Sequence, residues 1–281
     1  MFAQHRHSQC ARSSTALPAS AERIRSRRRS RLSAMCATAT AGRGEAPVSL
    51  RGRLVLLDRD GVVNVDVGSP GVTSAEDFRL EKGAAAALAK LKLAGASVCL
   101  VTNQTCVGKG LVTEDGLEAI HRRMRELLVE EGGVNAVLDD ILYATRTADV
   151  PCDRRKPAPG MLLEAMTSFD VRKEDATMVG DTVTDMQAAV AAGVEDRVLV
   201  GTGYGARVLE AHRAAAAEGA TAAAAAATAT PIHDDTPFRI MSSADDPSGT
   251  LPPETLPLTL CANFEKAAEF LLTRSSPPSK R

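Results

Sequence analysis

Two aspartates follow a short apolar run near position 55 of this 281-residue chain. Asp58 and Asp60 stand in the stretch LVLLDRDGVVN, directly before Gly61, which lets the backbone turn sharply. Because alternate residues of an extended segment point the same way, both carboxylates can face one substrate. One carboxylate can then act as a nucleophile that forms a covalent aspartyl intermediate, and the other as an acid and base. Taken alone, D-x-D-G fits an Asp-rich turn or a calcium loop equally well.

Two further polar residues could bind a phosphoryl group. Thr102 ends the apolar stretch LVTNQ, and its hydroxyl and the backbone N–H groups beside it can donate to phosphoryl oxygens. Lys156 in RRKPAPGM is a compact cation that can neutralise a phosphoryl group as it is attacked. The alternatives are a helix cap for Thr102 and a solvated surface cation for Lys156. The other clusters in the sequence support the phosphoryl-binding interpretation of both residues.

The fourth cluster is MVGDTVTD, where Asp181 ends an apolar strand and Asp185 lies four residues further on. Hard oxygen ligands at one sheet edge suit Mg²⁺, which bridges carboxylates to a substrate phosphate. The metal would also screen the repulsion between Asp58 and an anionic phosphate. Asp185 is expected either to bind the metal directly or to be a helix-capping carboxylate that orients Lys156.

The elements that must position these clusters alternate between strand and helix from residue 53 onward. Short apolar runs predict strands at 53–58, 97–103, 141–145, 176–181, 197–203 and 256–260. Helices are expected at 84–95, 157–169 and 184–193. Two more are expected to begin after capping residues, one after Thr113 and one, at 264–272, after Asn263. This order predicts an α/β fold with a parallel sheet, in which ligands bind at the carboxyl ends of the strands. All four clusters fall at such ends.

Composition limits the class of protein. Hydrophobic residues make up 44% of the chain, enough for a sizeable core, and no apolar run approaches the roughly 18 residues of a membrane span. We therefore expect a soluble protein that does not bind membranes. The six cysteines show neither a C-x-x-C pair nor a disulfide framework, which favours a reducing compartment.

The amino terminus differs in charge from the rest of the chain. Residues 1–50 contain nine arginines and two glutamates, a net charge of +7, so the remainder carries −8 of the overall −1. An Arg-rich, Ser-rich and acid-poor terminus is typical of an organellar transit peptide, here for the chloroplast or alternatively the mitochondrion. The other interpretation is a basic arm that contacts nucleic acid. The acidic balance of the rest and its few aromatic residues argue against a nucleic-acid phosphatase.

The chain is expected to divide into five parts. Residues 51–205 form the catalytic core, and the Ala-rich and turn-rich stretch 206–254 reads as a low-complexity flexible insertion. Residues 255–273 supply a final strand and helix of the core. Residues 1–50 and 274–281 are expected to be disordered, the former as the transit peptide.

The four clusters together resemble the haloacid dehalogenase (HAD) superfamily of phosphotransferases. Its motifs match in order as LDRDGVVN, VTNQ, CDRRKPAPGM and VGDTVTDMQAAVAAG. The resemblance implies a Rossmann-like three-layer sandwich with a mainly parallel central sheet. It also implies that Asp58 is the nucleophile, Asp60 the acid/base, and Thr102 and Lys156 the phosphoryl-binding residues. Mg²⁺ would be held by Asp58, the Asp60 carbonyl and Asp181.

Within that superfamily the motifs look most like the D,D-heptose 1,7-bisphosphate phosphatase and histidinol-phosphatase group. That group has a minimal (C0-type) cap, and the short spacing from Asp60 to Thr102 agrees with one. The implied activity is hydrolysis of a sugar phosphate such as D-glycero-D-manno-heptose 1,7-bisphosphate, with histidinol phosphate as the alternative substrate and an inactive binding protein as the alternative class. We expect a monomer. The implied substrate contacts are Asp66, Gly68, Ser69, Thr102, Asn103, Gln104, Thr105 and Arg155.

Two departures from that group affect the expectations. Many heptose phosphatases hold a structural zinc with four Cys and His ligands before the lysine motif. Here only Cys152 matches, and Arg154 stands where another cysteine would fall, so no zinc is expected. The loop after the first motif has Gly68–Ser69 where the group has glycine and an aromatic residue, which bears on sugar specificity.

Overall fold

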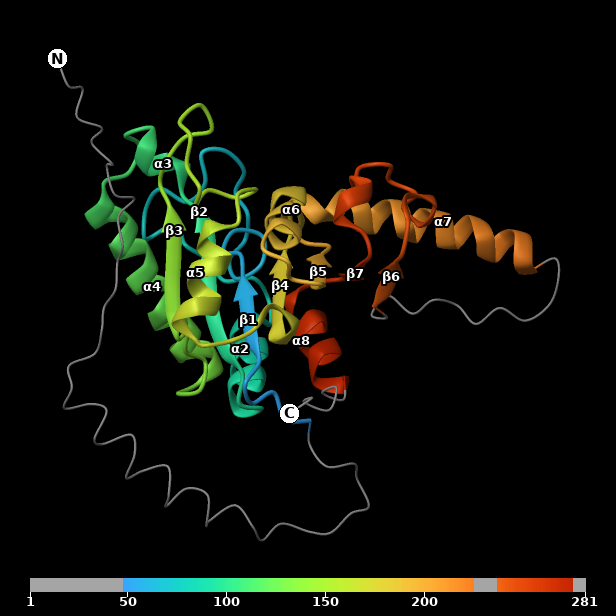
Figure 1. Ribbon diagram of the computed structural model, residues 1–281, viewed down its shortest axis with the longest axis horizontal. Helices are drawn as coiled ribbons and strands as arrows, with labels where there is room; N and C mark the ends of the chain where they lie inside the picture. Colours follow the sequence, from blue (N-terminus) through green and yellow to red (C-terminus); the bar gives the residue numbers. More distant parts are fainter. Residues whose placement is uncertain (1–47, 225–236, 275–281) are drawn as a thin grey trace, which may run out of the picture. The chain divides into compact units, whose positions relative to one another are not determined.

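A computed structural model describes residues 48–224 and 237–274 of the chain (Figure 1). Its centre is a seven-stranded sheet in the order β3-β2-β1-β4-β5-β7-β6. All neighbouring strands are parallel except β6, which pairs antiparallel with β7 at one edge. The strands are β1 (Leu54–Leu57), β2 (Ser97–Asn103), β3 (Asp140–Ala144), β4 (Ala176–Gly180), β5 (Asp196–Val200), β6 (Phe238–Ile240) and β7 (Leu258–Cys261).

Helices cover both faces of the sheet, which confirms the predicted three-layer α/β fold (Figure 1). Alternate residues of β1 point to opposite faces: Val55 and Leu57 enter one core, and Leu54 and Leu56 the other. The first core is closed by α2 (Ala84–Leu93), α4 (Glu114–Gly132) and α8 (Phe264–Thr273). The second is closed by α5 (Gly160–Ser168), α6 (Val183–Ala191) and the start of α7 (Ala206–Ala224).

Side-chain caps fix where three helices begin. The Thr113 hydroxyl accepts from the Gly116 amide at 3.0 Å before α4, and Asn263 accepts from the Lys266 amide at 2.9 Å before α8. Such caps satisfy backbone donors that have no partner inside the helix. Thr182 caps α6 in a capping box with Asp185. The Thr182 cap therefore fixes the start of α6 directly after Asp181.

The strand register brings the predicted clusters to one edge. Leu57, the last residue of β1, lies beside Leu100 of β2 and Val179 of β4. The chain therefore leaves β1 at Asp58 and β4 at Asp181 on the same edge, where Thr102 also lies near the end of β2. β1 is also where the strand order reverses direction, the place where open α/β sheets bind ligands.

The connection from β1 to α2, residues 58–83, contains only isolated bridges between Asp60, Asn64 and Leu80. This short connection matches the predicted minimal cap. A four-residue helix, α3 (Thr105–Gly108), follows β2 and lies at the edge formed by the carboxyl ends of the strands.

The predicted insertion 206–254 contains regular elements in its described parts. Helix α7 buries Val208 and Leu209, and β6 adds an antiparallel edge strand. Alanine favours helix, so composition alone does not distinguish a helix from a flexible linker here. Residues 225–236 and 275–281 lie outside the described residues, as do residues 1–47, which make up most of the predicted transit peptide 1–50. No helix in the described part is long and apolar enough to span a bilayer.

Candidate active site

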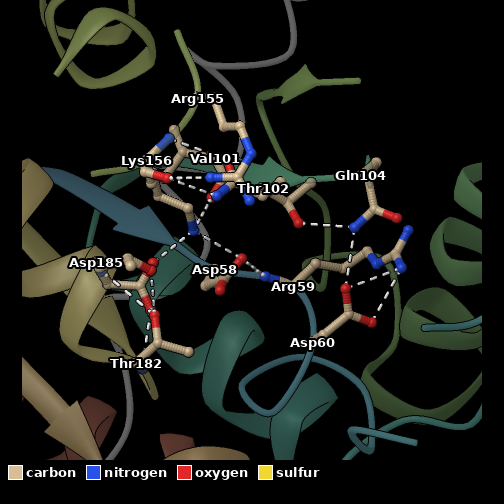
Figure 2. Close-up of polar contacts among 12 residues, drawn as sticks. Asp58, Arg59, Asp60, Val101, Thr102, Gln104, Arg155, Lys156, Thr182 and Asp185 are labelled. Atoms are coloured by element: carbon tan, nitrogen blue, oxygen red, sulfur yellow. Dashed lines mark hydrogen bonds and ion pairs between the residues drawn. The ribbon is translucent and has the colours of Figure 1, made fainter. Parts of the chain in front are cut away.

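Asp58 leaves β1 with one carboxylate oxygen engaged and the other open. Its Oδ1 accepts from the Arg59 amide at 2.7 Å and from Lys156 Nζ at 2.9 Å. Its Oδ2 accepts no hydrogen bond from the described residues, and the side chain lines a surface pocket (Figure 2). A carboxylate fixed through one oxygen with the second facing a pocket has the geometry of a nucleophile.

Lys156 is a buried cation between two carboxylates. Its ammonium lies 2.9 Å from Asp58 Oδ1 and 2.5 Å from Asp185 Oδ1, and it donates to the Val101 carbonyl at 2.8 Å (Figure 2). Burial alone lowers the pKa of Lys156, but Asp185 and Asp58 outweigh burial and raise it, so the ammonium stays charged. Asn103 fixes the lysine backbone through two bonds, accepting from the Lys156 amide at 3.0 Å and donating to its carbonyl at 2.9 Å.

Asp185 is held by Thr182 through one oxygen and by an ion pair with Lys156 through the other. Its Oδ2 accepts from the Thr182 amide at 3.0 Å and from the Thr182 hydroxyl at 2.7 Å, and its Oδ1 contacts Lys156. This is the arrangement expected of a capping carboxylate that orients Lys156, one of the two roles open from the sequence.

Asp181, by contrast, keeps one oxygen unpaired. Its Oδ2 accepts from the Tyr204 amide at 2.8 Å, whereas the buried Oδ1 has no hydrogen-bond partner among the described residues. Two glycines at positive φ, Gly61 and Gly203, lie so close to this carboxylate that an added Cβ would fall 2.3 and 2.2 Å from Asp181 Oδ2. Only glycine fits at these two positions, which press the backbone against Asp181.

Burial and neighbouring charges raise the pKa of two carboxylates in this cluster, Asp58 and Asp181. Burial and the Asp185 charge raise the pKa of Asp58 to about 7, although Lys156 opposes the shift. Burial, followed by Asp58 and Asp185, raises the pKa of Asp181 to about 9. Oxygen atoms of Asp58, Asp181 and Asp185 lie within 4.8 Å of one another. One lysine does not balance three close carboxylates, so the cluster calls for a second cation.

A divalent metal ion fits this cluster. Asp181 Oδ1 and Asp58 Oδ2 both lack partners in the described part of the chain, and both are hard oxygen ligands of the kind that Mg²⁺ prefers. Asp185 differs in that its Oδ1, although it too accepts no hydrogen bond, forms an ion pair with Lys156, and its Oδ2 is bound by Thr182. The orphaned Asp181 oxygen is the observation that carries this assignment.

Asp60 has an environment unlike that of Asp58. Arg59 Nη2 donates to both of its oxygens at 3.0 Å, Asn64 Nδ2 to Oδ1 at 2.9 Å and Gln104 Nε2 to Oδ2 at 3.0 Å (Figure 2). Burial alone would raise the pKa of Asp60, but Arg59 and the other donors lower it. The pKa values of the two aspartates are therefore shifted in opposite directions.

Comparison with known proteins agrees with this geometry. The sequence model of HAD-hydrolase-like proteins matches residues 153–230. Over 158 residues the chain is 39% identical to the D-glycero-beta-D-manno-heptose-1,7-bisphosphate 7-phosphatase of Pseudomonas putida, covering 56% of this chain and 87% of that protein. It is 38% identical over 157 residues to the phosphatase of the same name from Bordetella bronchiseptica, covering 56% and 85%. The chain belongs to the HAD-hydrolase-like family.

A solved structure shares the fold of this HAD phosphatase chain. The D,D-heptose 1,7-bisphosphate phosphatase of B. bronchiseptica, crystallised with magnesium and phosphate, superimposes with a TM-score of 0.59 at 31% identity. The match covers 78% of this chain and 98% of the other. The predicted family, fold class and enzyme class, a HAD-type phosphatase, are thereby confirmed.

The pocket of this HAD phosphatase gathers the residues singled out from the sequence. It encloses about 340 Å³, within the range of small-molecule sites, and opens beside Asp58 and Lys156. Gly68 donates its amide to Asp66 Oδ1 at 3.0 Å in the loop that forms one wall. Arg155 donates from Nη1 to the Lys156 carbonyl at 3.0 Å, and its buried Nε has no partner among the described residues. All predicted site residues line this pocket: Asp58, Asp60, Asp66, Gly68, Ser69, Thr102, Asn103, Gln104, Thr105, Arg155, Lys156 and Asp181.

Several residues of the site escaped the sequence reasoning. Thr182, Thr184 and Tyr204 also line the pocket, and the fully buried Arg59 contacts Asp60. Tyr204 follows β5 in GTGYG, whose glycines were a usable signal for a close approach. Arg59 carried no such signal, because arginine is seldom fully buried.

Proposed function

We propose that this chain is a Mg²⁺-dependent phosphomonoesterase that hydrolyses a sugar bisphosphate, D-glycero-D-manno-heptose 1,7-bisphosphate, through an aspartyl-phosphate intermediate. The observation that carries the proposal is the open Asp58 oxygen at the pocket, with the Lys156 ammonium 2.9 Å from its other oxygen. The names of the similar proteins from P. putida and B. bronchiseptica support the substrate.

The proposed reaction has two displacements at phosphorus. In the first, Asp58 Oδ2 forms a bond to phosphorus while the bond to the sugar oxygen breaks, and Asp60 gives that oxygen a proton. In the second, Asp60 takes a proton from water, whose oxygen displaces Asp58 and releases phosphate. The donors on Asp60 favour its ionised form. Asp60 reaches that form by giving its proton to the sugar oxygen, and it regains a proton from water in the second displacement.

Charge in both displacements is stabilised by groups that are already in place. Lys156 and the Thr102 side chain, each 1% exposed, line the pocket, where they would contact the phosphoryl oxygens. Asp58, Asp181 and the Asp60 carbonyl would hold Mg²⁺, which when bound neutralises the charge that the nucleophile and the phosphate share.

A substrate screen tests the proposal. Purified full-length protein with Mg²⁺ is assayed with heptose 1,7-bisphosphate, histidinol phosphate, and hexose and pentose phosphates. We expect the heptose bisphosphate to give the highest kcat/KM. A higher value for histidinol phosphate would replace the substrate, and failure to hydrolyse even 4-nitrophenyl phosphate would favour a catalytically idle binding protein.

The metal content and the cellular location are part of the proposal. We expect magnesium to support turnover and no zinc to be bound. Arg154, in the loop before Lys156, stands where a zinc-binding cysteine would fall, and it pairs with Glu164 at 2.7 Å. Elemental analysis that finds one zinc per chain would contradict this. The composition of residues 1–50 supports import into a chloroplast. A fluorescent protein fused to these residues should enter that organelle, and entry into mitochondria or retention outside both would contradict the location.

A further inference from the structure

The acid/base Asp60 is held by a chain of contacts that begins on helix α4, outside the pocket. Arg59 donates to both oxygens of Asp60, which fixes the plane of the carboxylate (Figure 2). The Arg59 side chain is 0% exposed, and among the described residues Asp60 is the one carboxylate in an ion pair with it. The Nε of Arg59 has no hydrogen-bond partner among the described residues, so the buried guanidinium depends on the partners of its two Nη atoms.

His121 of α4 supplies one such partner. Its Nε2 lies 3.5 Å from Arg59 Nη1, and His121 is not among the residues that line the pocket. Arginine has no acceptor, so this contact requires a lone pair on His121 Nε2 and places the ring proton on Nδ1. Nδ1 lies 4.0 Å from Glu118 Oε1. Burial, together with Arg59, lowers the pKa of His121 to about 3, in agreement with a neutral ring.

The His121 ring is itself fixed by its surroundings. It is 1% exposed and packs against the ring of Tyr143, with centroids 5.5 Å apart and planes inclined by 55°. Tyr143 pairs in register with Thr102, and its hydroxyl donates to Glu118 at 3.3 Å. The imidazole therefore has little freedom to rotate away from Arg59.

We propose that His121 is a positioning residue of the phosphatase, which holds the Arg59 guanidinium and through it sets the Asp60 carboxylate for proton transfer. This inference rests on the proposed function for its activity readout. An apolar side chain at position 121 would leave Arg59 Nη1 without this partner and free the guanidinium to turn. Asp60 would then keep its charge and its other donors but lose its fixed plane.

The test compares two substitutions that differ in one acceptor atom. His121→Leu keeps the volume and removes the acceptor, whereas His121→Gln places an amide oxygen near the former Nε2. We expect His121→Leu to lower kcat roughly tenfold with KM within about twofold, a fraction of what acid/base catalysis supplies. His121→Gln should restore most of that loss. Met124→Ala, in the same core face of α4 and without a polar contact, is the stability control and should leave kcat unchanged.

A double-mutant cycle separates positioning from a general structural effect. In an Asp60→Asn background, His121→Leu should change the residual hydrolysis of 4-nitrophenyl phosphate less than about twofold, because its effect passes through Asp60. An equal loss in both backgrounds, or a loss in His121→Gln as large as in His121→Leu, would overturn the inference. If His121→Leu does not fold, His121→Asn, whose shorter amide cannot reach Arg59, takes its place.

A structural readout keeps the inference apart from the proposed function. An inactive wild-type protein would refute the function, not the contact. In that case crystal structures of wild type and His121→Leu decide: displacement of the Arg59 guanidinium and the Asp60 carboxylate in the variant supports the inference, and unchanged positions overturn it.

Discussion

Asp58 and Asp60 stand two residues apart, yet the protein drives their pKa values in opposite directions. Asp58 lies among other buried carboxylates, and its pKa rises to about 7, whereas Arg59, Asn64 and Gln104 lower that of Asp60. The turn after β1 therefore holds two aspartates whose pKa values differ because their surroundings differ. Asp58 is the proposed nucleophile, whose negative charge a cation must stabilise. Asp60 is the proposed acid/base, and hydrogen-bond donors hold its carboxylate in place.

Replacing the nucleophile should separate activity from stability. Asp58→Asn removes the attacking oxygen and should lower kcat by more than roughly a thousandfold, as the loss of a nucleophile does elsewhere. It also removes one of three crowded carboxylates, so the metal-free variant should unfold at a Tm equal to or above that of the wild type at pH 8. Activity assays and thermal denaturation measure both. Wild-type-like rates in this variant would refute the nucleophile.

Removing the buried lysine should be costly for stability. Lys156→Met leaves Asp58 and Asp185 without their shared cation, and losing one partner of a buried pair costs about 3–5 kcal/mol. The double variant Lys156→Met/Asp185→Asn should regain part of that loss, because it removes a charge that the first change left uncompensated. Urea denaturation of both variants gives the free energies of unfolding. Equal stability of Lys156→Met and the wild type would show that the lysine does not balance these carboxylates.

Stability of the metal-free protein should fall as the pH rises. Asp58 and Asp181 have folded-state pKa values of about 7 and about 9, above the value of 3.8 for a free side chain. Between these limits the folded state binds more protons than the unfolded state, so each group's contribution is complete below pH 4 and is lost by about pH 9. Tm measured in EDTA should therefore drop from pH 6.5 to pH 8. Asp181→Asn should flatten this drop, and a rise of Tm in wild type over the same range would contradict the assignment.

Magnesium should oppose that drop. A ligand at 100 times its Kd stabilises the folded state by about 2.7 kcal/mol, and binding requires ionised carboxylates. Added Mg²⁺ should thus raise Tm more at pH 8 than at pH 5.5. Asp181→Asn should lose most of this shift, while Asp115→Asn, an exposed carboxylate in the first turn of α4, should keep it. A shift that survives Asp181→Asn would place the cation elsewhere.

Local patterns in the sequence were sufficient for most of the fold. The run SVCLVTN predicts the bounds of β2, and the Thr113 and Asn263 caps mark the starts of α4 and α8. Strand β6 has three residues and depends on pairing with β7, so no local pattern announces it. Helix α7 lies in an Ala-rich stretch, where composition fits both a helix and a linker.

For the site, sequence order revealed the charged residues but not their partners. Asp58 and Asp181 directly follow strands, so parallel topology alone brings them to one edge. Lys156 lies in the loop between β3 and α5, and Asn103 fixes its backbone beside them. The division of labour between Asp181 and Asp185 depends on which oxygens the Tyr204 amide and Thr182 occupy, and that follows from packing. The contact of Arg59 with His121 joins residues 62 positions apart and has no sequence signature.

The central claim is that Asp58 becomes phosphorylated, and chemical trapping tests it most directly. Asp60→Asn should retard hydrolysis of the aspartyl phosphate, so the variant is mixed with acetyl phosphate and Mg²⁺ and quenched with borohydride, which reduces acyl phosphates to alcohols. Mass spectrometry of the peptide that contains β1 should then show homoserine at position 58. Homoserine at position 181 or 185, or none while the wild type turns over the same substrate, would contradict the account.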